Sequence, residues 1–345
     1  MASSEKYMYR CITLAKQAQG NVSPNPMVGA VLVHNGSIIG EGFHEQFGKN
    51  HAEVNCLNSV PEDKKHLIKD STLYVSLEPC SHFGKTPPCT ELIISNEIKK
   101  LIIGSTDPNP LVSGRGINHL RSVGIEVTEG ILKEETDQLN NRFFTFHQKN
   151  RPYVILKWAE TADRKLSAAE GQKLKISGKT IDMMVHKWRA EEDAIMVGRN
   201  TALLDNPQLT TRLWKGKNPI RIVTDPEANL PETLNLFDGE APLVVLNMLK
   251  DEKHGEVLYK KIKTSGVNEI LYALKELNIC SVIVEGGAAL LNSFITAGLW
   301  DEARIIINKD LVAGNGIAAP EKPEGILEDT VKIGREEILF LKNMH

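Results

Sequence analysis

The sequence predicts an α/β protein of two domains. Its 345 residues exceed the roughly 100–200 residues that one domain usually contains. Segments with helical and strand-like patterns alternate through both halves, which is typical of a sheet covered by helices on both faces. A polar stretch over residues 143–151 leads into Pro152, after which a new strand begins. We therefore expect a first domain over residues 1–147 and a second over residues 148–345.

The composition limits what the protein can be. Hydrophobic residues make up 41% of the chain and charged residues 25%, which is ordinary for a globular protein. The net charge is −3 and no long lysine or arginine run occurs, so we expect no nucleic-acid partner. No apolar stretch is long enough to cross a membrane, and residues 1–6 do not begin a signal peptide. Five cysteines are too few for a disulfide framework, which favours a cytoplasmic protein; a homo-oligomer is left open.

The first half begins with an amphipathic helix over residues 5–19, which Gly20 ends. Two strands follow, and the Asn35-Gly36 pair between them predicts a hairpin turn. The remaining elements expected in this half are helices over residues 51–59, 89–97 and 116–123, and strands over residues 28–33, 38–42, 72–77, 101–104 and 125–128.

The second half repeats the alternation of strands and helices. No Gly-x-Gly-x-x-Gly follows a predicted strand, so a Rossmann dinucleotide domain is not indicated. Glu285-Gly286-Gly287 leads into a helix and could approach a pyrophosphate, although such a pair is also an ordinary strand-to-helix turn. The expected strands cover residues 153–158, 194–197, 220–224, 243–246, 281–284 and 303–307, and the expected helices cover 179–191, 269–277 and 288–297.

Four residues of the first half predict a zinc deaminase site. His51 and Glu53 fall at the start of a helix, while Cys80 and Cys89 follow the next strand. One imidazole and two thiolates leave a tetrahedral zinc with an open position, which a catalytic zinc needs. Zinc acidifies water there, and a carboxylate that does not bind the metal can move protons to a leaving amine. We therefore predict His51, Cys80 and Cys89 as ligands and Glu53 as the catalytic residue.

The spacing of the two cysteines leaves one alternative open. Eight residues separate Cys80 from Cys89, whereas the common deaminase signature has two. A closed structural zinc site would need a fourth protein ligand, and His82 in the inserted stretch could provide it.

Five segments together resemble the bifunctional deaminase–reductases of riboflavin biosynthesis. They are residues 24–29 (PNPMVG), 51–53 (HAE), 77–89 (LEPCSHFGKTPPC), 107–110 (DPNP) and 114–116 (GRG). The long insertion between the cysteines is that family's own form. The resemblance continues through the second half and covers nearly the whole chain.

This resemblance implies two reactions and two cofactors. It implies a cytidine-deaminase-like, three-layer first domain that uses Zn²⁺ to deaminate diaminohydroxyphosphoribosylaminopyrimidine. It also implies a dihydrofolate-reductase-like second domain that uses NADPH to reduce the ribosyl group of the product to ribityl. The expected partner is therefore a small phosphoribosyl pyrimidine. The alternative is a zinc deaminase of another nucleobase, whose second domain is a scaffold or only weakly active.

Six residues near the predicted zinc are candidates for binding the deaminase substrate. The amide of Asn25 can pair with a pyrimidine edge, although a turn between two prolines also explains it. Asp107 and Asn109 follow a strand end, where ligands of open α/β sheets bind, although a rigid turn is the alternative. Histidine and lysine would add positive charge for the phosphate or ring substituents. The six are Asn25, His44, His82, Lys85, Asp107 and Asn109.

In the second half the resemblance places residues at cofactor and substrate positions. Guanidinium groups match phosphate oxygens, which suits arginine at substrate positions. For Lys157, near the reacting ribose, a plain salt bridge is an equal alternative. The cofactor positions hold Ala159, Lys175, Thr201, Asp205, Gly286 and Gly287. The substrate positions hold Lys157, Arg189, Leu209, Arg212 and Glu285.

Three positions of the second half depart from the family's pattern. Arg164 stands where the family has glycine, in Asp-Gly-Lys. Lys173 and Lys175 stand where the family has a serine and a tryptophan. Two long cations in place of a small hydroxyl and a flat aromatic ring would change the walls of the cofactor and substrate sites, which puts the strength of the reductase in question.

Overall fold

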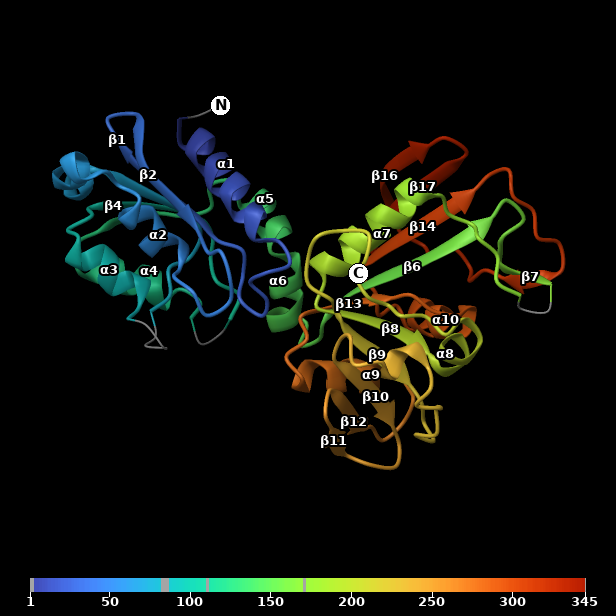
Figure 1. Cartoon of the computed structure of the whole chain (residues 1–345). Helices are drawn as coiled ribbons and strands as arrows, with labels where there is room; N and C mark the ends of the chain where they lie inside the picture. The colour runs from blue at the N-terminus through green and yellow to red at the C-terminus, as the bar shows by residue number, and fades with distance from the viewer. Residues whose placement is uncertain (1–2, 82–86, 110–111, 170–171, 345) are drawn as a thin grey trace. The chain divides into compact units, whose positions relative to one another are not determined.

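The computed structural model describes residues 3–81, 87–109, 112–169 and 172–344. The chain forms two compact units, Met1–Asn150 and Arg151–His345 (Figure 1), and each is considered by itself. The division falls slightly after the predicted one, because helix α6 (Asn141–Gln148) runs through the expected boundary. None of the helices in the described part of the chain has the length and hydropathy of a bilayer-spanning segment.

The first unit is built on a five-stranded sheet. Its strands are β1 (Gly29–His34), β2 (Ser37–Phe43), β3 (Thr72–Leu77), β4 (Lys100–Ser105) and β5 (Glu126–Thr128), in the order β2-β1-β3-β4-β5. β1 pairs antiparallel with β2 and β3, whereas β3, β4 and β5 are parallel. The hairpin turns at Asn35 and Gly36, and both have positive φ, as the Asn-Gly pair predicts. All five strands were expected from the sequence.

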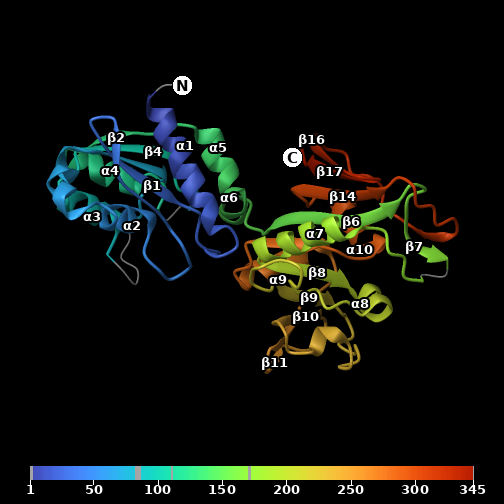
Figure 2. The same cartoon turned by 45° about the horizontal axis from the view of Figure 1, so that its top comes forward.

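Helices cover both faces of this sheet, which gives three layers (Figures 1 and 2). Along β1 the buried side chains alternate between the faces, with Ala30 and Leu32 on one and Val31 and Val33 on the other. The first face packs against α2 (Ala52–Asn58), α3 (Cys89–Ser95) and α4 (Arg115–Ser122). The second packs against α1 (Ser3–Ala15) and α5 (Lys133–Leu139); short 3₁₀ turns η1 (Lys16–Ala18) and η2 (Glu62–Asp70) complete the unit.

One expectation for this unit is wrong. Residues 143–151 were interpreted as a polar junction, but their first part lies in α6. Phe143 and Phe146 are buried, and they stand three residues apart, so they fall on one face of the helix. The polar residues between and after them hide this pattern in the sequence. Only residues after Gln148 are left to connect the two units.

Gly29 brings α1 directly against β1. A Cβ atom at Gly29 would lie 2.0 Å from the carbonyl oxygen of Cys11, which belongs to the backbone of α1. We expect Gly29→Ala to lower the free energy of unfolding of the first unit by about 1–3 kcal/mol, because the helix must move away from the sheet. Thermal melting followed by circular dichroism measures this. An unchanged melting temperature would contradict the close packing.

The second unit contains a ten-stranded sheet. Seven strands are parallel neighbours through its centre, and antiparallel strands finish both ends. The order is β11 (Glu252–His254), β12 (Val257–Lys261), β10 (Leu243–Asn247), β9 (Ile220–Thr224), β8 (Ala194–Gly198), β13 (Ser281–Val284), β6 (Tyr153–Thr161), β14 (Glu302–Asn308), β17 (Glu336–Lys342) and β16 (Ile326–Ile333). A separate pair joins β7 (Lys165–Ala169) to β15 (Gly316–Ala318).

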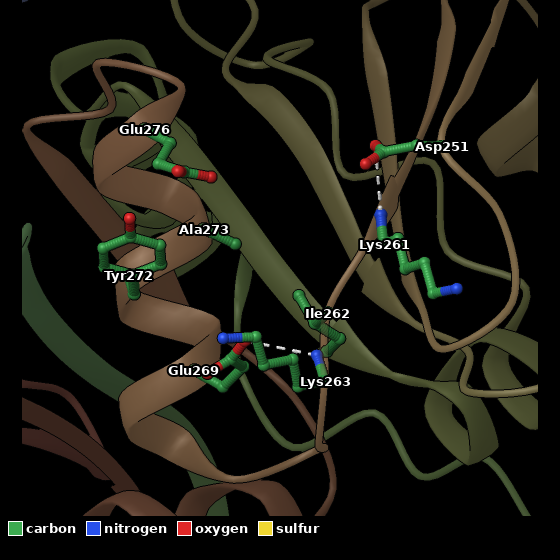
Figure 3. A pocket seen from close by; sticks show the side chains of 8 residues that line it. All are labelled: Asp251, Lys261, Ile262, Lys263, Glu269, Tyr272, Ala273 and Glu276. Atoms are coloured by element: carbon green, nitrogen blue, oxygen red, sulfur yellow. Dashed lines mark hydrogen bonds between the residues drawn. The ribbon is translucent and has the colours of Figure 1, made fainter.

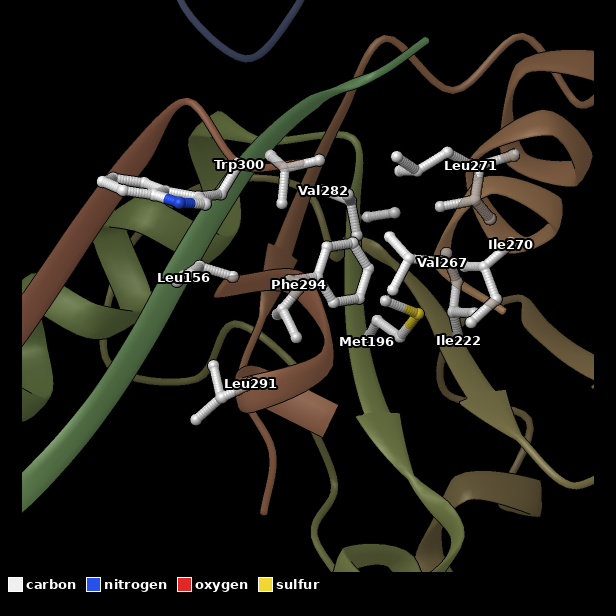
Figure 4. Close-up of a cluster of buried hydrophobic side chains, with 14 of the residues drawn as sticks. Leu156, Met196, Ile222, Val267, Ile270, Leu271, Val282, Leu291, Phe294 and Trp300 are labelled. Carbon is white, nitrogen blue, oxygen red and sulfur yellow. The ribbon is translucent and has the colours of Figure 1, made fainter. Parts of the chain in front are cut away.

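Two hydrophobic cores lie on opposite faces of this sheet. One core contains side chains of α9 (Val267–Glu276) and α10 (Ala288–Ala297), and Figure 4 shows Phe294 at its centre beside Met196 and Val282. The other contains side chains of α7 (Lys179–Glu191) and α8 (Arg199–Asp205), and the short turn η3 (Asn235–Phe237) adds Leu236. The sheet covered on both faces, as the sequence predicts, is therefore present in each unit.

Candidate active sites

The predicted zinc ligands lie together at the end of β3 in the first unit. His51 immediately precedes α2, Cys80 follows β3, and Cys89 is the first residue of α3. The Nδ1 atom of His51 lies 3.2 Å from the Sγ atom of Cys89 and 3.6 Å from that of Cys80. Their ligand atoms all lie within 4.8 Å of one another. The fold thus brings together side chains from three separate segments: the residue before α2, the loop after β3 and the start of α3.

These distances fit a tetrahedral zinc. With Zn–S and Zn–N bonds of ordinary length, a nitrogen and a sulfur ligand stand about 3.6 Å apart. Both measured nitrogen–sulfur distances are close to this value. The set provides one imidazole and two thiols, which leaves one of the four tetrahedral positions for water or substrate. The residues therefore fit the metal that the sequence predicts.

The pKa values of four side chains in and beside this cluster are shifted from their ordinary values. A hydrogen bond from Cys89 lowers the pKa of the Cys80 thiol to about 4, whereas the same bond raises the pKa of Cys89. Hydrogen bonding to Cys80 raises the pKa of His51. Burial raises the pKa of Glu53, whose side chain is only 3% exposed in the first turn of α2. The cluster thus holds a thiolate ready for a cation, and a buried carboxyl beside it that can exchange protons.

Asn25 and His44 lie beside this cluster. The ring of His44 stands 5.4 Å from that of His51, edge to face. Its Nδ1 lies 2.9 Å from the carbonyl oxygen of Asn50, which can only accept, so Nδ1 carries the proton. Burial lowers the pKa of His44, and in the neutral ring Nε2 accepts from the Asn25 amide at 3.2 Å. The amide nitrogen of Asn25 is thereby directed to His44, while its backbone N–H donates to the carbonyl of Val22 at 2.8 Å and closes the turn considered as the alternative.

Asp107 and Asn109 follow β4 on the segment before α4. The carboxylate of Asp107 accepts the backbone N–H of Asn109 at 2.8 Å, which is the rigid turn considered as an alternative. The backbone N–H of Asp107 donates to the carboxylate of Glu78, beside the zinc turn. His82 and Lys85, the other two candidates for the deaminase substrate, lie outside the described residues.

In the second unit, three of the predicted residues form a buried charge cluster. Arg189 donates to both carboxylate oxygens of Glu285, at 3.3 and 2.7 Å, and the ammonium of Lys157 lies 3.7 Å from the same carboxylate. Although burial opposes it, the charges of Arg189 and Lys157 lower the pKa of Glu285 to about 2. Burial lowers the pKa of Lys157. The salt-bridge alternative for Lys157 is therefore realised, within a cluster of net positive charge.

Arg212 joins this cluster through Thr210. The hydroxyl of Thr210 accepts from Arg212 at 2.8 Å, and its carbonyl accepts from Arg189 at 3.3 Å. The backbone N–H of Arg212 donates to Nδ1 of His186 at 2.8 Å. Burial and the two arginines lower the pKa of His186 to about 4. Leu209, another predicted substrate residue, has positive φ and a buried side chain in the core, so only its backbone can face a ligand.

Two of the predicted cofactor residues, Thr201 and Gly287, are in contact just after the ends of β8 and β13. The backbone N–H of Gly287 donates to the hydroxyl of Thr201 at 2.8 Å, and α10 begins directly afterwards, as predicted. A Cβ at Gly286 would lie 3.0 Å from the backbone of Val197, so glycine allows this close approach. Ala159 lies on the neighbouring part of the sheet, in β6. β6, β13 and β8 are parallel neighbours, so their carboxyl ends reach one edge of the sheet.

Comparison with known proteins shows the family to which each half of the chain is similar. Residues 1–105 match the cytidine and deoxycytidylate deaminase zinc-binding region, and residues 152–324 match the RibD C-terminal domain. The riboflavin biosynthesis protein RibD of Aquifex aeolicus is 40% identical over 341 residues, covering 97% of this chain and 94% of that protein. RibD of Actinobacillus pleuropneumoniae is 42% identical, covering 95% and 90%. The chain belongs to the RibD family.

Solved RibD structures share the whole architecture. A Thermotoga maritima diaminohydroxyphosphoribosylaminopyrimidine deaminase/5-amino-6-(5-phosphoribosylamino)uracil reductase superposes with a TM-score of 0.89 at 37% identity, covering 99% of each chain. Acinetobacter baumannii RibD gives a TM-score of 0.90 at 30% identity, again covering 99% of each chain. The chain is thus a bifunctional enzyme of riboflavin biosynthesis, with a cytidine-deaminase-like zinc deaminase and a dihydrofolate-reductase-like, NADPH-dependent reductase.

The departures from the RibD pattern have structural counterparts. Arg164 adopts a φ of 58°, in the left-handed region that explains a glycine at this position, and its guanidinium is anchored on the carbonyl of Pro320. The ammonium of Lys173 donates to the carbonyl of Asp205 at 2.6 Å, so it touches a predicted cofactor residue. Lys175 pairs with Asp182 at the surface, with 71% of its side chain exposed. That pairing turns Lys175 toward α7.

A groove of about 600 Å³ lies elsewhere on the second unit, between β12 and α9 (Figure 3). Two of its carboxylates accept backbone N–H groups of the lining: Asp251 accepts that of Lys261, and Glu269 accepts that of Lys263. None of the residues predicted for the RibD reactions lines it. The lining residues are Asp251, Lys261, Ile262, Lys263, Glu269, Tyr272, Ala273 and Glu276.

Three residues of these sites were not among the sequence candidates. His186 and Thr210 hold Arg212, and Glu78 contacts the segment of Asp107. His186 stands three residues before Arg189 on α7, so helical spacing could have placed both on one face. Thr210 gives no signal in the sequence, because its role depends on two arginines from different elements.

Proposed function

We propose that the first unit deaminates diaminohydroxyphosphoribosylaminopyrimidine and that the second reduces the resulting 5-amino-6-(5-phosphoribosylamino)uracil with NADPH. The observation that carries the proposal is the His51, Cys80 and Cys89 cluster, with Glu53 buried in the first turn of α2. The Thermotoga maritima relative with this pair of activities aligns along the whole chain. Its substrates are therefore the first to test.

In the deaminase, the chain's own residues would bind the ring and move protons. Zinc held by the cluster supplies a Lewis acid that activates water. Glu53 takes a proton from the water as its oxygen bonds to the ring carbon, and returns one to the amine as the C–N bond breaks and ammonia leaves. Asn25, oriented by His44, would hydrogen-bond the pyrimidine edge, and Asp107 and Asn109 would contact the substrate from the segment after β4.

In the reductase, the positive cluster would bind the phosphate and ribosyl groups. Arg189 and Arg212, linked by Thr210, offer guanidinium forks to the phosphate. Lys157 and Glu285 lie at the carboxyl end of neighbouring parallel strands, where the ribosyl group would sit. Thr201, Asp205, Gly286 and Gly287 would hold NADPH, which would supply a hydride. The sugar carbon would accept that hydride as its bond to the ring oxygen breaks, and the ring oxygen would take up a proton, which gives the open ribityl chain.

The proposal also includes a reducing, cytoplasmic setting and leaves room for a homo-oligomer. All five cysteines of the chain are free thiols. Cys80 and Cys89 must stay reduced to bind zinc, and a disulfide between them would abolish the site. Size-exclusion chromatography with light scattering would give the oligomeric state.

A two-step assay tests the proposed reactions. We expect one zinc per chain by metal analysis, ammonia release from the phosphoribosyl pyrimidine, and NADPH oxidation that requires the deaminated product. Ammonia from cytidine but none from this pyrimidine would refute the substrate and favour the nucleobase deaminase. Deamination without NADPH oxidation would restrict the activity to the first unit, and would point to Lys173 and Lys175 as the cause.

A further inference from the structure

Glu78 is a buried carboxylate that neither of the reactions above uses. It lies between the end of β3 and the ligand Cys80, and only 4% of it is exposed. Its Oε1 atom accepts the backbone N–H groups of Gly116 and Ile117, at 3.0 and 3.3 Å. Its Oε2 atom accepts those of Asp107 and Gly114, at 3.2 and 3.0 Å. One side chain therefore binds four backbone groups of a single segment.

That segment, described over residues 107–109 and 112–117, lies between β4 and the first turn of α4. It begins with Asp107 and Asn109 and ends in the first turn of α4. The first N–H groups of a helix have no acceptor within the helix, and here Glu78 is the acceptor for those of Gly116 and Ile117. A negative charge is favourable at a helix N-terminus. The backbone N–H of Glu78 itself donates to the carbonyl of Ser105 at 2.9 Å, which extends the pairing of β3 with β4. The backbone of Glu78 is thus held in the sheet next to the zinc ligand Cys80, while its side chain binds the segment.

The same contacts explain the Gly-Arg-Gly motif of the sequence. Gly114 has a φ of 71° as it enters α4, a conformation that glycine adopts without strain. A Cβ at Gly116 would lie 2.5 Å from the carbonyl oxygen of Pro79 and 3.2 Å from Oε1 of Glu78. Glycine at this position lets α4 approach the turn that carries Cys80.

We propose that Glu78 is a positioning residue for deamination: it ties the segment of Asp107 and Asn109 to the zinc turn. The zinc turn and this segment then keep one spacing, because the carboxylate that precedes Cys80 is also the acceptor for the segment. This inference rests on the proposed function, which assigns Asp107 and Asn109 to the substrate.

A carboxylate is required because all four partners are donors. An ionised glutamate offers two oxygens and about four lone pairs, so it satisfies the four N–H groups at once. A glutamine would keep one oxygen and turn an NH₂ group toward two N–H donors. Half of the segment would lose its acceptor, while the size of the side chain and the three zinc ligands would be unchanged.

We expect Glu78→Gln to raise the KM of deamination about tenfold while kcat changes less, which corresponds to about 1.4 kcal/mol of lost substrate binding. Zinc content should stay at one per chain. NADPH oxidation with the deaminated product supplied directly should be unchanged, since it reports on the second unit. Glu126→Gln is the matched control, because Glu126 is exposed in the same unit and pairs only with Lys100 among the described residues.

The outcomes separate this inference from the proposed function. An unchanged KM, or a fall of kcat with zinc lost, would overturn the positioning role and leave a structural one. If Glu78→Gln does not fold, Gly116→Ala tests the same link, because its Cβ pushes the segment away from Pro79 and from Oε1 of Glu78 while the glutamate itself is retained. The same rise in KM is expected, and its absence would overturn the inference. Failure of the unaltered chain to deaminate the pyrimidine would instead refute the proposed function.

Discussion

Glu53→Gln is expected to lower the rate of deamination by about 10²- to 10⁴-fold, the usual contribution of a general acid–base group. Glutamine has nearly the same shape, but it cannot take a proton from water or return one to the amine. Glu53 is buried in the first turn of α2 and belongs to none of the three ligand positions. We therefore expect the variant to keep one zinc per chain by metal analysis, together with the melting temperature of the parent.

Two controls define what the Glu53 result means. His51→Ala removes a ligand and should lose both zinc and deamination, so it gives the zinc content and the rate expected when the metal is absent. NADPH oxidation with the deaminated product supplied should be normal in Glu53→Gln, because that reaction belongs to the other unit. Deamination at the parent rate in zinc-loaded Glu53→Gln would eliminate Glu53 as the proton carrier.

Local signals explain which parts of the fold could be predicted. Asn35-Gly36 specifies its hairpin within two residues, and the short, mainly apolar runs of β1 and β3 mark these strands in the sequence. By contrast, β16 has mostly exposed side chains at the edge of its sheet, so it carries no apolar pattern, and its pairing with β17 is what makes it a strand. α6 was missed because its apolar residues stand among polar ones.

In the candidate sites, too, residues with a local sequence signal could be predicted and residues without one could not. The zinc ligands could be found because the metal requires particular residue types in order, whatever the chain does between them. The contacts of His186 with Arg212 and of Glu78 with Gly116 join residues far apart in sequence, and each uses a backbone group on one side. A backbone N–H is present at every non-proline residue, so the sequence holds no trace of which one is bound.

Glu285→Gln should have the largest effect on the second unit. Glu285 forms ion pairs with both Arg189 and Lys157, and its replacement leaves these buried cations without the carboxylate that balances their charge. Breaking such a buried pair from one side costs about 3–5 kcal/mol. We expect that loss in the free energy of unfolding of the second unit by denaturant titration, together with loss of NADPH oxidation. Glu276→Gln, at an exposed pair on the same unit, should change neither.

The pH dependence gives an independent check on Glu285. Its pKa falls from an ordinary 4.5 to about 2 in the folded unit, so the folded state holds the carboxylate more strongly than the unfolded chain does. The stabilisation is complete above pH 4.5 and is lost as pH falls from 4.5 to about 2. The difference in stability between parent and Glu285→Gln should therefore shrink over that window. A constant difference would mean that the loss comes from packing rather than from charge.

A double variant distinguishes charge from catalysis at this cluster. Arginine cannot shed its proton, so Arg189 is the costly partner once Glu285 is gone, whereas burial already lowers the pKa of Lys157. Arg189→Met with Glu285→Gln should thus be more stable than Glu285→Gln alone, because the remaining lysine can become neutral. It should still fail to oxidise NADPH, since the phosphate and ribosyl contacts are absent. A double variant no more stable than Glu285→Gln would show that the buried charge of Arg189 is not what destabilises the unit.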